Sequence, residues 1–374
     1  MATRGKTHED YMREALAQAE LGRGRTRPNP MVGCVIVKNG RIIAAGHHAR
    51  AGLAHAEVVA LAAAGERARG ADAYVTLEPC SHVGRTGPCA QALIAAGVRR
   101  VFVGVRDPNP LVHGRGLRAL TRAGIDVQVG VLGEPCLRLN EAFAHFIVAH
   151  RPYVIAKVAQ SLDGRVATRT GASRWVSGEP ARAFGHALRN ACDGIMVGSG
   201  TVLADDPALT CRLDGGRDPL RIVVDTLART PPLAKVVQAA RRSAAPTLIA
   251  TTSRASETRR RALVRAGAEV FVCRQRRGRV DLECLLDELG RRELLSVLVE
   301  GGPTLLGAMF DSHLVHKLHA FVAPLIIGGA EALSSVGGVG PALLRDAVQL
   351  GALELVPVGA DLMVTAYPRY ARAH

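Results

Sequence analysis

The chain has 374 residues, of which 48% are hydrophobic and 22% charged, and this composition excludes a disordered chain. Its length predicts two or three domains, each able to bury a core of its own. No apolar run approaches the ~18 residues that a membrane helix needs, and the polar N-terminal segment lacks the apolar stretch of a secretory signal. We therefore expect a cytoplasmic protein without a membrane partner.

The net charge of +15 is compatible with nucleic acid as a partner. However, only five of the 48 basic residues are lysines, and the arginines are scattered along the chain, which is typical of a genome-wide base bias. Aromatic residues make up 3% of the chain, so stacking surfaces for single strands are scarce. We therefore expect no nucleic-acid partner.

The eight cysteines are expected to be free thiols, because the chain is long, is not dense in cysteine and shows no secretory signal. Most of them, such as Cys34, Cys273 and Cys284, stand in apolar strings and are expected to be buried small side chains. Only Cys80 and Cys89 share a loop rich in turn residues.

In the first 150 residues, two hairpin strands around the turn signal Asn39-Gly40 are followed by alternating helices and strands. The expected elements are helix 8–21, strand 31–37, strand 41–46, helix 54–68, strand 71–77, helix 88–97, strand 99–105, helix 114–124 and strand 125–130. This order predicts a three-layer α/β domain.

A helical segment over 133–152 comes next, and we place the domain boundary between residues 150 and 151. The expected elements beyond it are strand 153–159, helix 179–191, strands 194–197, 220–225 and 247–251, helix 254–266, strand 269–273, helix 281–291, strand 295–299, helix 303–312 and strand 317–323. They predict a second α/β domain over 151–374, and no repeat relates the two halves.

A histidine, a glutamate and two cysteines carry the clearest chemistry. His55 and Glu57 open a helix, and Cys80 and Cys89 each follow a proline. One imidazole and two thiolates suit Zn²⁺ with its fourth tetrahedral position open, where a bound water has its pKa lowered to about 7. We expect Glu57 to move protons for that water without binding the metal.

The same pattern leaves alternatives open. Histidine-x-glutamate followed by proline-cysteine is typical of zinc nucleobase deaminases, although eight residues separate the cysteines here rather than two. The alternative function is therefore a nucleic-acid base deaminase with an accessory domain, which the positive charge favours. A purely structural zinc would usually recruit four protein ligands, and only His82 could supply the fourth.

Longer blocks resemble the bifunctional deaminase–reductase family of riboflavin biosynthesis. The blocks are PNPMVGCVIV, HAE, PCSHVGRTGPC, RDPNPLVHGRGL, KVAQSLDGRVA, GTVLADDPALTCR, VEGGPTLLGA and APLIIGG. They stand in the family's order over nearly the whole chain. The resemblance implies a cytidine-deaminase-like three-layer α/β domain followed by a dihydrofolate-reductase-like α/β domain.

For the first domain, the resemblance implies zinc-dependent hydrolytic deamination of 2,5-diamino-6-(5-phosphoribosylamino)pyrimidin-4-one. One zinc ion would be held by His55, Cys80 and Cys89, and Glu57 matches the proton shuttle. The residues that match the family's substrate contacts are Asn29, His48, His82 and Arg85.

Three positions carry further qualifications. Asp107 and Asn109 are additional candidates for the deaminase site, and a capping turn is the alternative explanation for both. The family often has lysine where Arg85 stands, so the charge is kept but the geometry of its contacts differs.

For the second domain, the resemblance implies NADPH reduction of the product's ribosyl group to ribityl. The residues that match cofactor contacts are Ala159, Trp175, Thr201, Asp205, Thr226, Gly302, Pro303, Thr304, Leu305, Leu306, Gly307 and Ala308. Those that match substrate contacts are Lys157, Ser173, Arg189, Leu209, Arg212 and Glu300. The family often has lysine where Leu325 stands. The resemblance also implies a homo-oligomer, a dimer or a tetramer.

Without the resemblance, the sequence motifs of residues 151–374 give weaker evidence for a particular function. This half has no GxGxxG pattern, and glycines follow the expected strands 194–197 and 295–299, where backbone amides at a helix start favour a phosphate. Core packing is the alternative for Trp175, and a solvated face is the alternative for Arg189 and Arg212.

Overall fold

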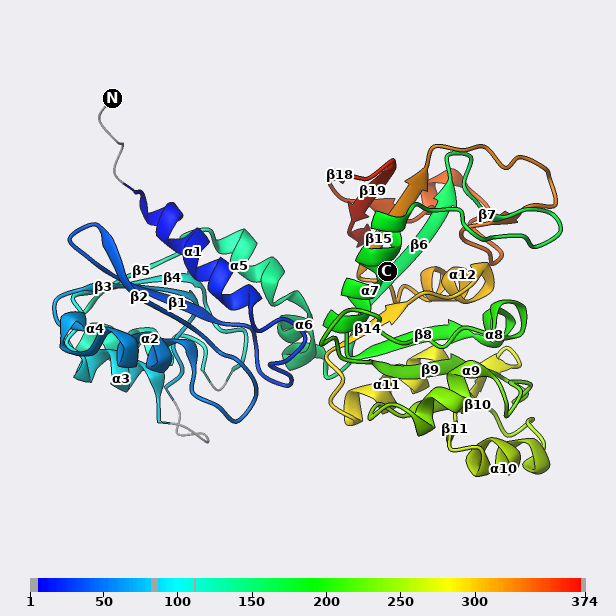
Figure 1. Cartoon of the computed structure of the whole chain (residues 1–374), viewed down its shortest axis with the longest axis horizontal. Helices are drawn as coiled ribbons and strands as arrows, with labels where there is room; N and C mark the ends of the chain where they lie inside the picture. Colours follow the sequence, from blue (N-terminus) through cyan, green and yellow to red (C-terminus); the bar gives the residue numbers. More distant parts are fainter. Residues whose placement is uncertain (1–5, 82–86, 111, 371–374) are drawn as a thin grey trace. The chain divides into compact units, whose positions relative to one another are not determined.

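The fold is described from a computed structural model, which covers residues 6–81, 87–110 and 112–370 (Figure 1). The chain divides into two compact units, Met1–His150 and Arg151–His374. Both are mixed α/β structures, and each is described by itself.

The first unit contains a five-stranded sheet with the order β2-β1-β3-β4-β5. Its strands are β1 (Gly33–Lys38), β2 (Arg41–His47), β3 (Asp72–Leu77), β4 (Arg100–Val105) and β5 (Asp126–Val129). β1 pairs antiparallel with β2 and β3, and β3, β4 and β5 are parallel. The expected hairpin turn is present, since Asn39 and Gly40 both have positive φ.

Helices cover both faces of this sheet (Figure 1). The helices are α1 (His8–Glu20), α2 (Ala56–Ala64), η1 (Gly65–Ala68), α3 (Cys89–Ala95), α4 (Arg115–Arg122), α5 (Gly133–Leu139) and α6 (Glu141–Ala149). One core layer joins α2, α3 and α4 to the sheet, and the other joins α1 and α5 to its opposite face. This arrangement confirms the predicted three-layer class.

Close packing of α1 on β1 depends on a glycine. A Cβ atom at Gly33 would lie 1.9 Å from the carbonyl oxygen of Ala15. The helix begins with a capping box between Thr7 and Asp10 and buries Tyr11, among others, against the sheet.

The helix predicted over residues 133–152 is not continuous in the structure. The sequence predicts a single helical segment over 133–152, and the structure breaks it at Asn140 into α5 and α6. The cause is tertiary: Asn140 accepts from the backbone N–H of Met31 and donates to its carbonyl oxygen, both at 2.8 Å. These paired contacts hold Asn140 at φ −116° and ψ 22°, outside the helical region.

The second unit contains a nine-stranded sheet with the order β11-β10-β9-β8-β14-β6-β15-β19-β18. Its strands are β6 (Tyr153–Ser161), β8 (Gly194–Gly198), β9 (Leu220–Val224), β10 (Thr247–Thr251), β11 (Glu269–Val272), β14 (Ser296–Val299), β15 (Lys317–Ala323), β18 (Glu354–Val358) and β19 (Asp361–Ala366). From β11 to β15 every neighbouring pair is parallel, so these strands end at one edge of the sheet.

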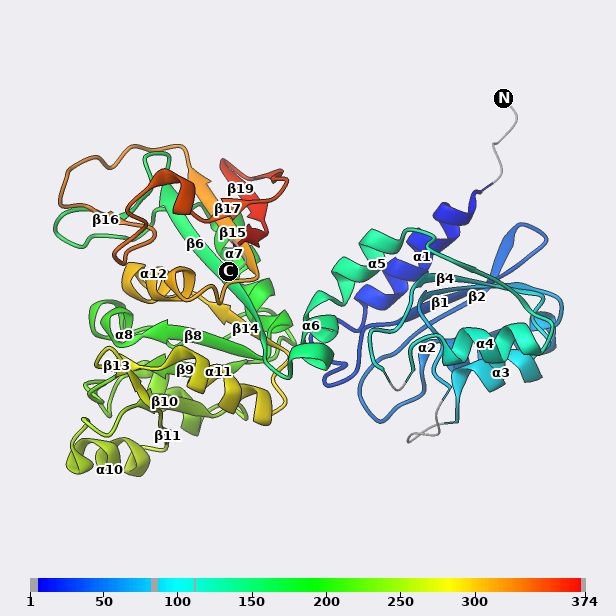
Figure 2. The ribbon, with the colours of Figure 1, turned by 180° about the vertical axis from the view of Figure 1, so that it is seen from behind.

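The main helices of this unit are α7 (Glu179–Ala191), α8 (Ser199–Asp205), α9 (Lys235–Gln238), α10 (Glu257–Arg265), α11 (Leu282–Arg291) and α12 (Pro303–Asp311). α11 and α12 pack on the face seen in Figure 2, whereas α8, α9 and α10 share a separate core on the other face. The remaining short elements are β7 (Arg165–Ala167), η2 (Ala239–Arg241), β12 (Gln275–Arg276), β13 (Arg279–Val280), β16 (Leu333–Ser334), η3 (Leu344–Asp346), β17 (Gln349–Leu350) and β20 (Pro368–Arg369).

All eight cysteines are free thiols, as expected. Cys34 and Cys273 are buried, whereas Cys284 is only partly buried. Among the helices in the described part of the chain, none has both the length and the apolar character of a membrane-spanning segment.

The contact between α1 and β1 gives the first prediction. We expect Gly33→Ala to lower the free energy of unfolding by about 1–3 kcal/mol, because the new methyl group meets backbone that cannot move aside cheaply. Gly87→Ala is the control, since no atom of the described residues lies within 4 Å of a Cβ there. Chemical denaturation measures both, and equal effects of the two changes would contradict the packing argument.

Candidate functional site

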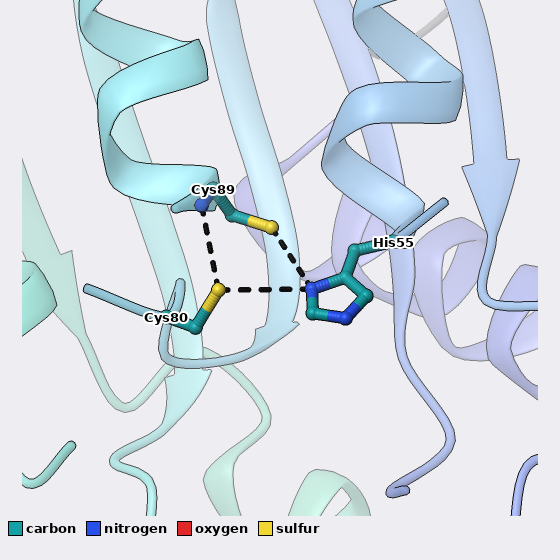
Figure 3. Close-up of side chains that lie close together, drawn as sticks. All are labelled: His55, Cys80 and Cys89. Atoms are coloured by element: carbon teal, nitrogen blue, oxygen red, sulfur yellow. Dashed lines mark hydrogen bonds between the residues drawn. The ribbon is translucent and has the colours of Figure 1, made fainter. Parts of the chain in front are cut away.

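Three side chains of types that can bind a metal converge in the first unit, as Figure 3 shows. His55 is the N-cap of α2, Cys80 follows β3, and Cys89 begins α3. Nδ1 of the histidine lies 3.2 Å from Sγ of Cys89 and 3.6 Å from Sγ of Cys80. The three ligand atoms all lie within 4.8 Å of one another. Within the described ranges, no other group of three or more His, Cys, Asp or Glu side chains meets this condition.

The donor set fits zinc. An imidazole nitrogen and two sulfurs are ligands that Zn²⁺ prefers, and three protein ligands leave one tetrahedral position open. The hydrogen bond with the Cys89 thiol and the adjacent His55 imidazole lower the pKa of Cys80 to about 4. The backbone N–H of Cys89 also donates to Sγ of Cys80, at 3.4 Å. The hydrogen bond between the two side chains favours the thiolate at Cys80 and raises the pKa of the Cys89 thiol.

Glu57 lies beside this cluster in the first turn of α2. Its side chain is buried, with 3% of the residue exposed. Burial raises its pKa to about 7, and a hydrogen bond with Cys89 acts in the opposite direction. A carboxyl group with a pKa near neutrality can both accept and donate a proton, which suits a proton shuttle.

Asn29 and His48, two of the predicted substrate contacts, lie next to each other. The carbonyl oxygen of Ala54 can only accept, so Nδ1 of His48 donates to it, at 3.1 Å. Nε2 of the same ring then accepts from Nδ2 of Asn29, also at 3.1 Å. The His48 ring meets the His55 ring edge-on at 5.2 Å, which connects the pair to the metal ligands. Burial lowers the pKa of His48, so its ring is neutral.

Two other predicted substrate contacts, His82 and Arg85, lie outside the described residues. Asp107 is buried, and its carboxylate accepts from the backbone N–H of Asn109 at 2.8 Å. That bond is the capping turn given as the alternative explanation for these two residues.

The sequence analysis missed Glu78, which positions the neighbouring loop. Its buried carboxylate accepts from the backbone N–H groups of Asp107, Gly114 and Gly116, at 3.3, 2.9 and 3.1 Å. A Cβ at Gly116 would lie 1.9 Å from the carbonyl oxygen of Pro79. The loop is therefore tied to the strand end that carries Cys80. The available signal was a carboxylate directly after an apolar strand and before a Pro-Cys pair.

In the second unit, the predicted cofactor contacts gather at the carboxyl edge of the sheet. The backbone N–H of Gly302, the N-cap of α12, donates to Oγ1 of Thr201 at 3.1 Å. Gly302 follows β14 and Thr201 follows β8, so two neighbouring strand ends meet there. A Cβ at Gly302 would lie 3.2 Å from that hydroxyl oxygen. Pro303 has no N–H, and the N–H groups of Leu305 and Leu306 donate to the Gly302 carbonyl, so the positive end of the α12 dipole rather than a row of free amides favours an anion here. These features fit a dinucleotide phosphate.

The other predicted cofactor contacts occupy several elements around this edge. Ala159 lies on β6, Asp205 ends α8, and Thr226 follows β9. The run Pro303, Thr304, Leu305, Leu306, Gly307 and Ala308 forms the first turns of α12, with Leu305 and Leu306 in the core.

Trp175 is 68% exposed, and the Arg182 guanidinium lies 4.6 Å from its ring centroid. The core-packing alternative for this tryptophan is therefore wrong.

Arg189 and Glu300 form a nearly buried bidentate ion pair. Both bonds between them are 2.9 Å, and the two side chains are 17% and 12% exposed. The solvated-face alternative for Arg189 is therefore wrong. Burial acts to raise the pKa of Glu300, but the charges of Arg189 and Lys157 outweigh it and hold that pKa below its ordinary value.

The structure therefore brings Lys157, Arg189 and Glu300 together. Burial lowers the pKa of His186, and the charges of Arg189 and Arg212 act in the same direction, so Arg212 lies within electrostatic range of this group. His186 itself was not predicted.

For three remaining positions, Ser173, Leu209 and Leu325, the structure gives only backbone contacts or burial. The Ser173 carbonyl accepts from the backbone N–H of Val176, and Leu209 is buried with a positive φ. Leu325 stands where the related family often has lysine, and its carbonyl accepts from the backbone N–H of Leu162 at 2.9 Å. That backbone bond does not depend on the side chain.

Comparisons with known proteins assign a different family model to each half of the chain. The family model described as the cytidine and deoxycytidylate deaminase zinc-binding region matches residues 5–105, and the RibD C-terminal domain matches residues 152–364. The riboflavin biosynthesis protein RibD of Actinobacillus pleuropneumoniae is 45% identical over 359 residues, covering 96% of this chain and 94% of that protein. RibD of Escherichia coli K12 is 44% identical over 372 residues, covering 95% and 97%.

Solved structures give the same result. RibD of Acinetobacter baumannii is 34% identical with a TM-score of 0.84, covering 96% of this chain and 98% of that chain. A Thermotoga maritima protein, a diaminohydroxyphosphoribosylaminopyrimidine deaminase/5-amino-6-(5-phosphoribosylamino)uracil reductase, is 33% identical with a TM-score of 0.82 and the same coverage. Similarity of this extent over nearly the full length of both chains shows that the chain belongs to the RibD family of bifunctional deaminase–reductases of riboflavin biosynthesis.

Proposed function

We propose that residues 1–150 deaminate 2,5-diamino-6-(5-phosphoribosylamino)pyrimidin-4-one, and that residues 151–374 reduce the ribosyl group of the product to ribityl with NADPH. The observation that carries the proposal is the convergence of His55, Cys80 and Cys89 beside the buried Glu57. The name of the similar Thermotoga maritima protein, which contains both activities, supports the choice of substrate.

In the deaminase unit, His55, Cys80 and Cys89 would hold the zinc ion. When bound there, zinc would supply the Lewis acidity that lowers the pKa of a water to about 7. The Glu57 carboxylate takes a proton from the attacking water and delivers it to the departing amino group. A C–O bond forms, the C–N bond breaks, and ammonia leaves. Asn29 would bind the ring edge through its Oδ1 and its second amide N–H, and His48 would position it, because both ring nitrogens of His48 are already hydrogen-bonded.

In the reductase unit, NADPH supplies a hydride when bound. The Thr201 hydroxyl, which accepts from the Gly302 N–H, would donate to its phosphates at the sheet edge. Arg189 is held by Glu300, so this pair orients sugar hydroxyls rather than acting as a free phosphate cation. Lys157 and Arg212 form no ion pair shorter than 4.0 Å with any described carboxylate, and we assign the substrate phosphate to them.

We also propose a cytoplasmic homo-oligomer, a dimer or a tetramer that assembles through the second unit. The free state of all eight cysteines supports a reducing compartment. The edge strand β18 and its surroundings expose apolar side chains, including Leu353 and Leu355, which supports pairing with another copy.

Glu57→Gln tests the proton shuttle. We expect the variant to keep one zinc ion per chain and the thermal stability of the wild type, but to lose about 10²–10⁴-fold in deamination rate. Metal analysis and mass spectrometry of the product measure the two quantities. Full deamination by a folded, zinc-loaded variant would show that the assignment is wrong.

Cys80→Ser tests whether the deaminase and reductase activities depend on different units of the chain. We expect loss of zinc and of deamination, while NADPH oxidation in the presence of added deaminated substrate changes less than twofold. The reason is that the ligands and the dinucleotide contacts lie in different units. Absorbance at 340 nm measures the oxidation. NADPH consumption by the wild type that never responds to that compound would defeat the reductase assignment.

Glu78→Gln tests the support of the metal site. The amide that replaces one carboxylate oxygen cannot accept from the loop N–H groups, so we expect about 10- to 100-fold weaker zinc affinity. Competition with a chelator measures it. The matched control is Glu66→Gln, an exposed glutamate in the same unit. Equal zinc affinity for both variants would contradict the role of Glu78.

A further inference from the structure

Two long loops leave neighbouring strands at the same edge of the second unit's sheet. β6 and β15 are parallel, and their last residues, Ser161 and Ala323, face each other. Residues 162–178, the β6–α7 loop, lead from β6 to α7, and residues 324–353, the β15–β18 loop, lead from β15 to β18. The loops run side by side, since β7 pairs antiparallel with β16 (Figures 1 and 2). Loops of this length within a compact domain are usually functional.

Asp163 joins the two loops near their bases. Its Oδ2 accepts from the backbone N–H of Gly328 at 2.8 Å, and its Oδ1 accepts from that of Ile327 at 3.1 Å. The hydroxyl of the buried Ser161 donates to Oδ1 at 2.5 Å and so fixes the carboxylate. One side chain therefore accepts bonds both from the end of its own strand and from the other loop.

The same donors keep this carboxylate ionised. The Ser161 hydroxyl, followed by the N–H groups of Ile327 and Gly328, lowers the pKa of Asp163 to about 2. An ionised carboxylate only accepts hydrogen bonds, and it accepts them more strongly than a neutral oxygen does. An amide in its place would turn an N–H group toward one of the donors, so the arrangement favours an acid at this position.

Further contacts support the β6–α7 loop beyond Asp163. The backbone N–H of Ser335 donates to the carbonyl oxygen of Gly164 at 3.0 Å. Nη1 of Arg165 donates to the carbonyl oxygen of Ala332 at 2.9 Å. The base of the β6–α7 loop is therefore held mainly by the β15–β18 loop.

The β15–β18 loop in turn packs on α12. The backbone N–H of Gly337 donates to the carbonyl oxygen of Pro303 at 2.9 Å. A Cβ atom at Gly307 would lie 2.1 Å from the carbonyl oxygen of Gly337, so the contact depends on this glycine. Pro303 and Gly307 belong to the run that we assign to the dinucleotide. The loop that holds Asp163 is thus seated on the helix that we expect to face the cofactor.

The far end of the β6–α7 loop carries Ser173 and Trp175, which we assign to substrate and cofactor. The turn over 168–172 before them is closed by hydrogen bonds within itself. Nη2 of Arg174 donates to the carbonyl oxygen of Asp205 at 2.9 Å. The position of Trp175 therefore depends on this arginine and on the base of the loop, where Asp163 lies.

We propose that Asp163 is a positioning residue of the reductase, which fixes the β6–α7 loop against the β15–β18 loop so that Ser173 and Trp175 face substrate and cofactor. The inference rests on the proposed NADPH-dependent reduction and adds to it a residue that touches neither ligand. Without Asp163 the loop occupies several arrangements, and only a fraction of the molecules can bind. The apparent dissociation constant then rises by the inverse of that fraction, whereas turnover of the bound complex is unchanged.

The fluorescence of Trp175 reports on this loop directly, because the chain contains a single tryptophan. Time-resolved anisotropy of the full-length protein without ligands compares Asp163→Asn with the wild type. We expect the nanosecond local motion of the tryptophan to increase in the variant. The matched control is Glu331→Gln, which removes one negative charge from an exposed position of the β15–β18 loop and should leave the anisotropy decay unchanged.

Steady-state kinetics separates positioning from general damage. We expect Asp163→Asn to raise the KM for NADPH by about 5- to 20-fold, corresponding to roughly 5–20% of molecules with the loop in place, and to change kcat less than twofold. Deamination should stay within twofold of the wild type, because the zinc ligands lie in the other unit. Thermal unfolding shows whether each variant is folded.

Ser161→Ala provides a second variant that keeps the carboxylate and removes only the hydroxyl that orients it. We expect it to raise the KM for NADPH in the same direction by a smaller factor, again at unchanged kcat. If Asp163→Asn does not fold, the comparison of Ser161→Ala with Glu331→Gln decides the proposal.

The outcomes separate the role of Asp163 from the proposed function. Greater motion of Trp175 with a higher KM at unchanged kcat supports the role. Unchanged motion, effects equal to those of Glu331→Gln, or a lower kcat at unchanged KM would overturn it while leaving NADPH-dependent reduction in place. A wild-type protein that never oxidises NADPH with the deaminated substrate would contradict the proposed reductase function itself, and the anisotropy comparison would still test the contact.

Discussion

The approach of one imidazole and two thiols to a common point is the constraint on which the first unit depends. It requires the start of α2, the end of β3 and the start of α3 to meet at one edge of the sheet. The same arrangement buries Glu57 next to the ligands and raises its pKa to about 7. The proposed metal site and the proposed proton shuttle thus depend on a single packing arrangement.

The second unit is also built from a sheet covered by helices, but its candidate site lies at the edge where the parallel strands end. Its parallel strands end at a common edge, and chemistry-bearing residues follow successive strands along it. The residues that we assign to the substrate gather around the Arg189–Glu300 pair, and those that we assign to the dinucleotide extend toward β9. The family shown by the comparisons joins both units in one chain, as the similarity over nearly the whole length indicates.

Much of the fold was predictable because buried elements carry strong patterns. Helix 179–191 and strands 247–251 and 317–323 have the predicted bounds. The strands β18 and β19 were not predicted, since β18 is exposed at the sheet edge and contains Pro357, which hides the alternation of a strand. The break at Asn140 depends on contacts with Met31, more than 100 residues away, and no local pattern shows such a contact. The convergence of His55, Cys80 and Cys89 was predictable from their types and spacing. The role of Glu78 was not, because its partners are backbone N–H groups of a loop 29 to 38 residues away.

X-ray absorption spectroscopy of the zinc-loaded wild-type protein tests the central claim most directly. The account predicts one zinc ion with two sulfur ligands at about 2.3 Å, one imidazole nitrogen at about 2.0 Å and one oxygen from solvent. A fourth protein ligand in place of the solvent oxygen would indicate a closed structural site. Either that spectrum or a protein that retains no zinc would contradict the account.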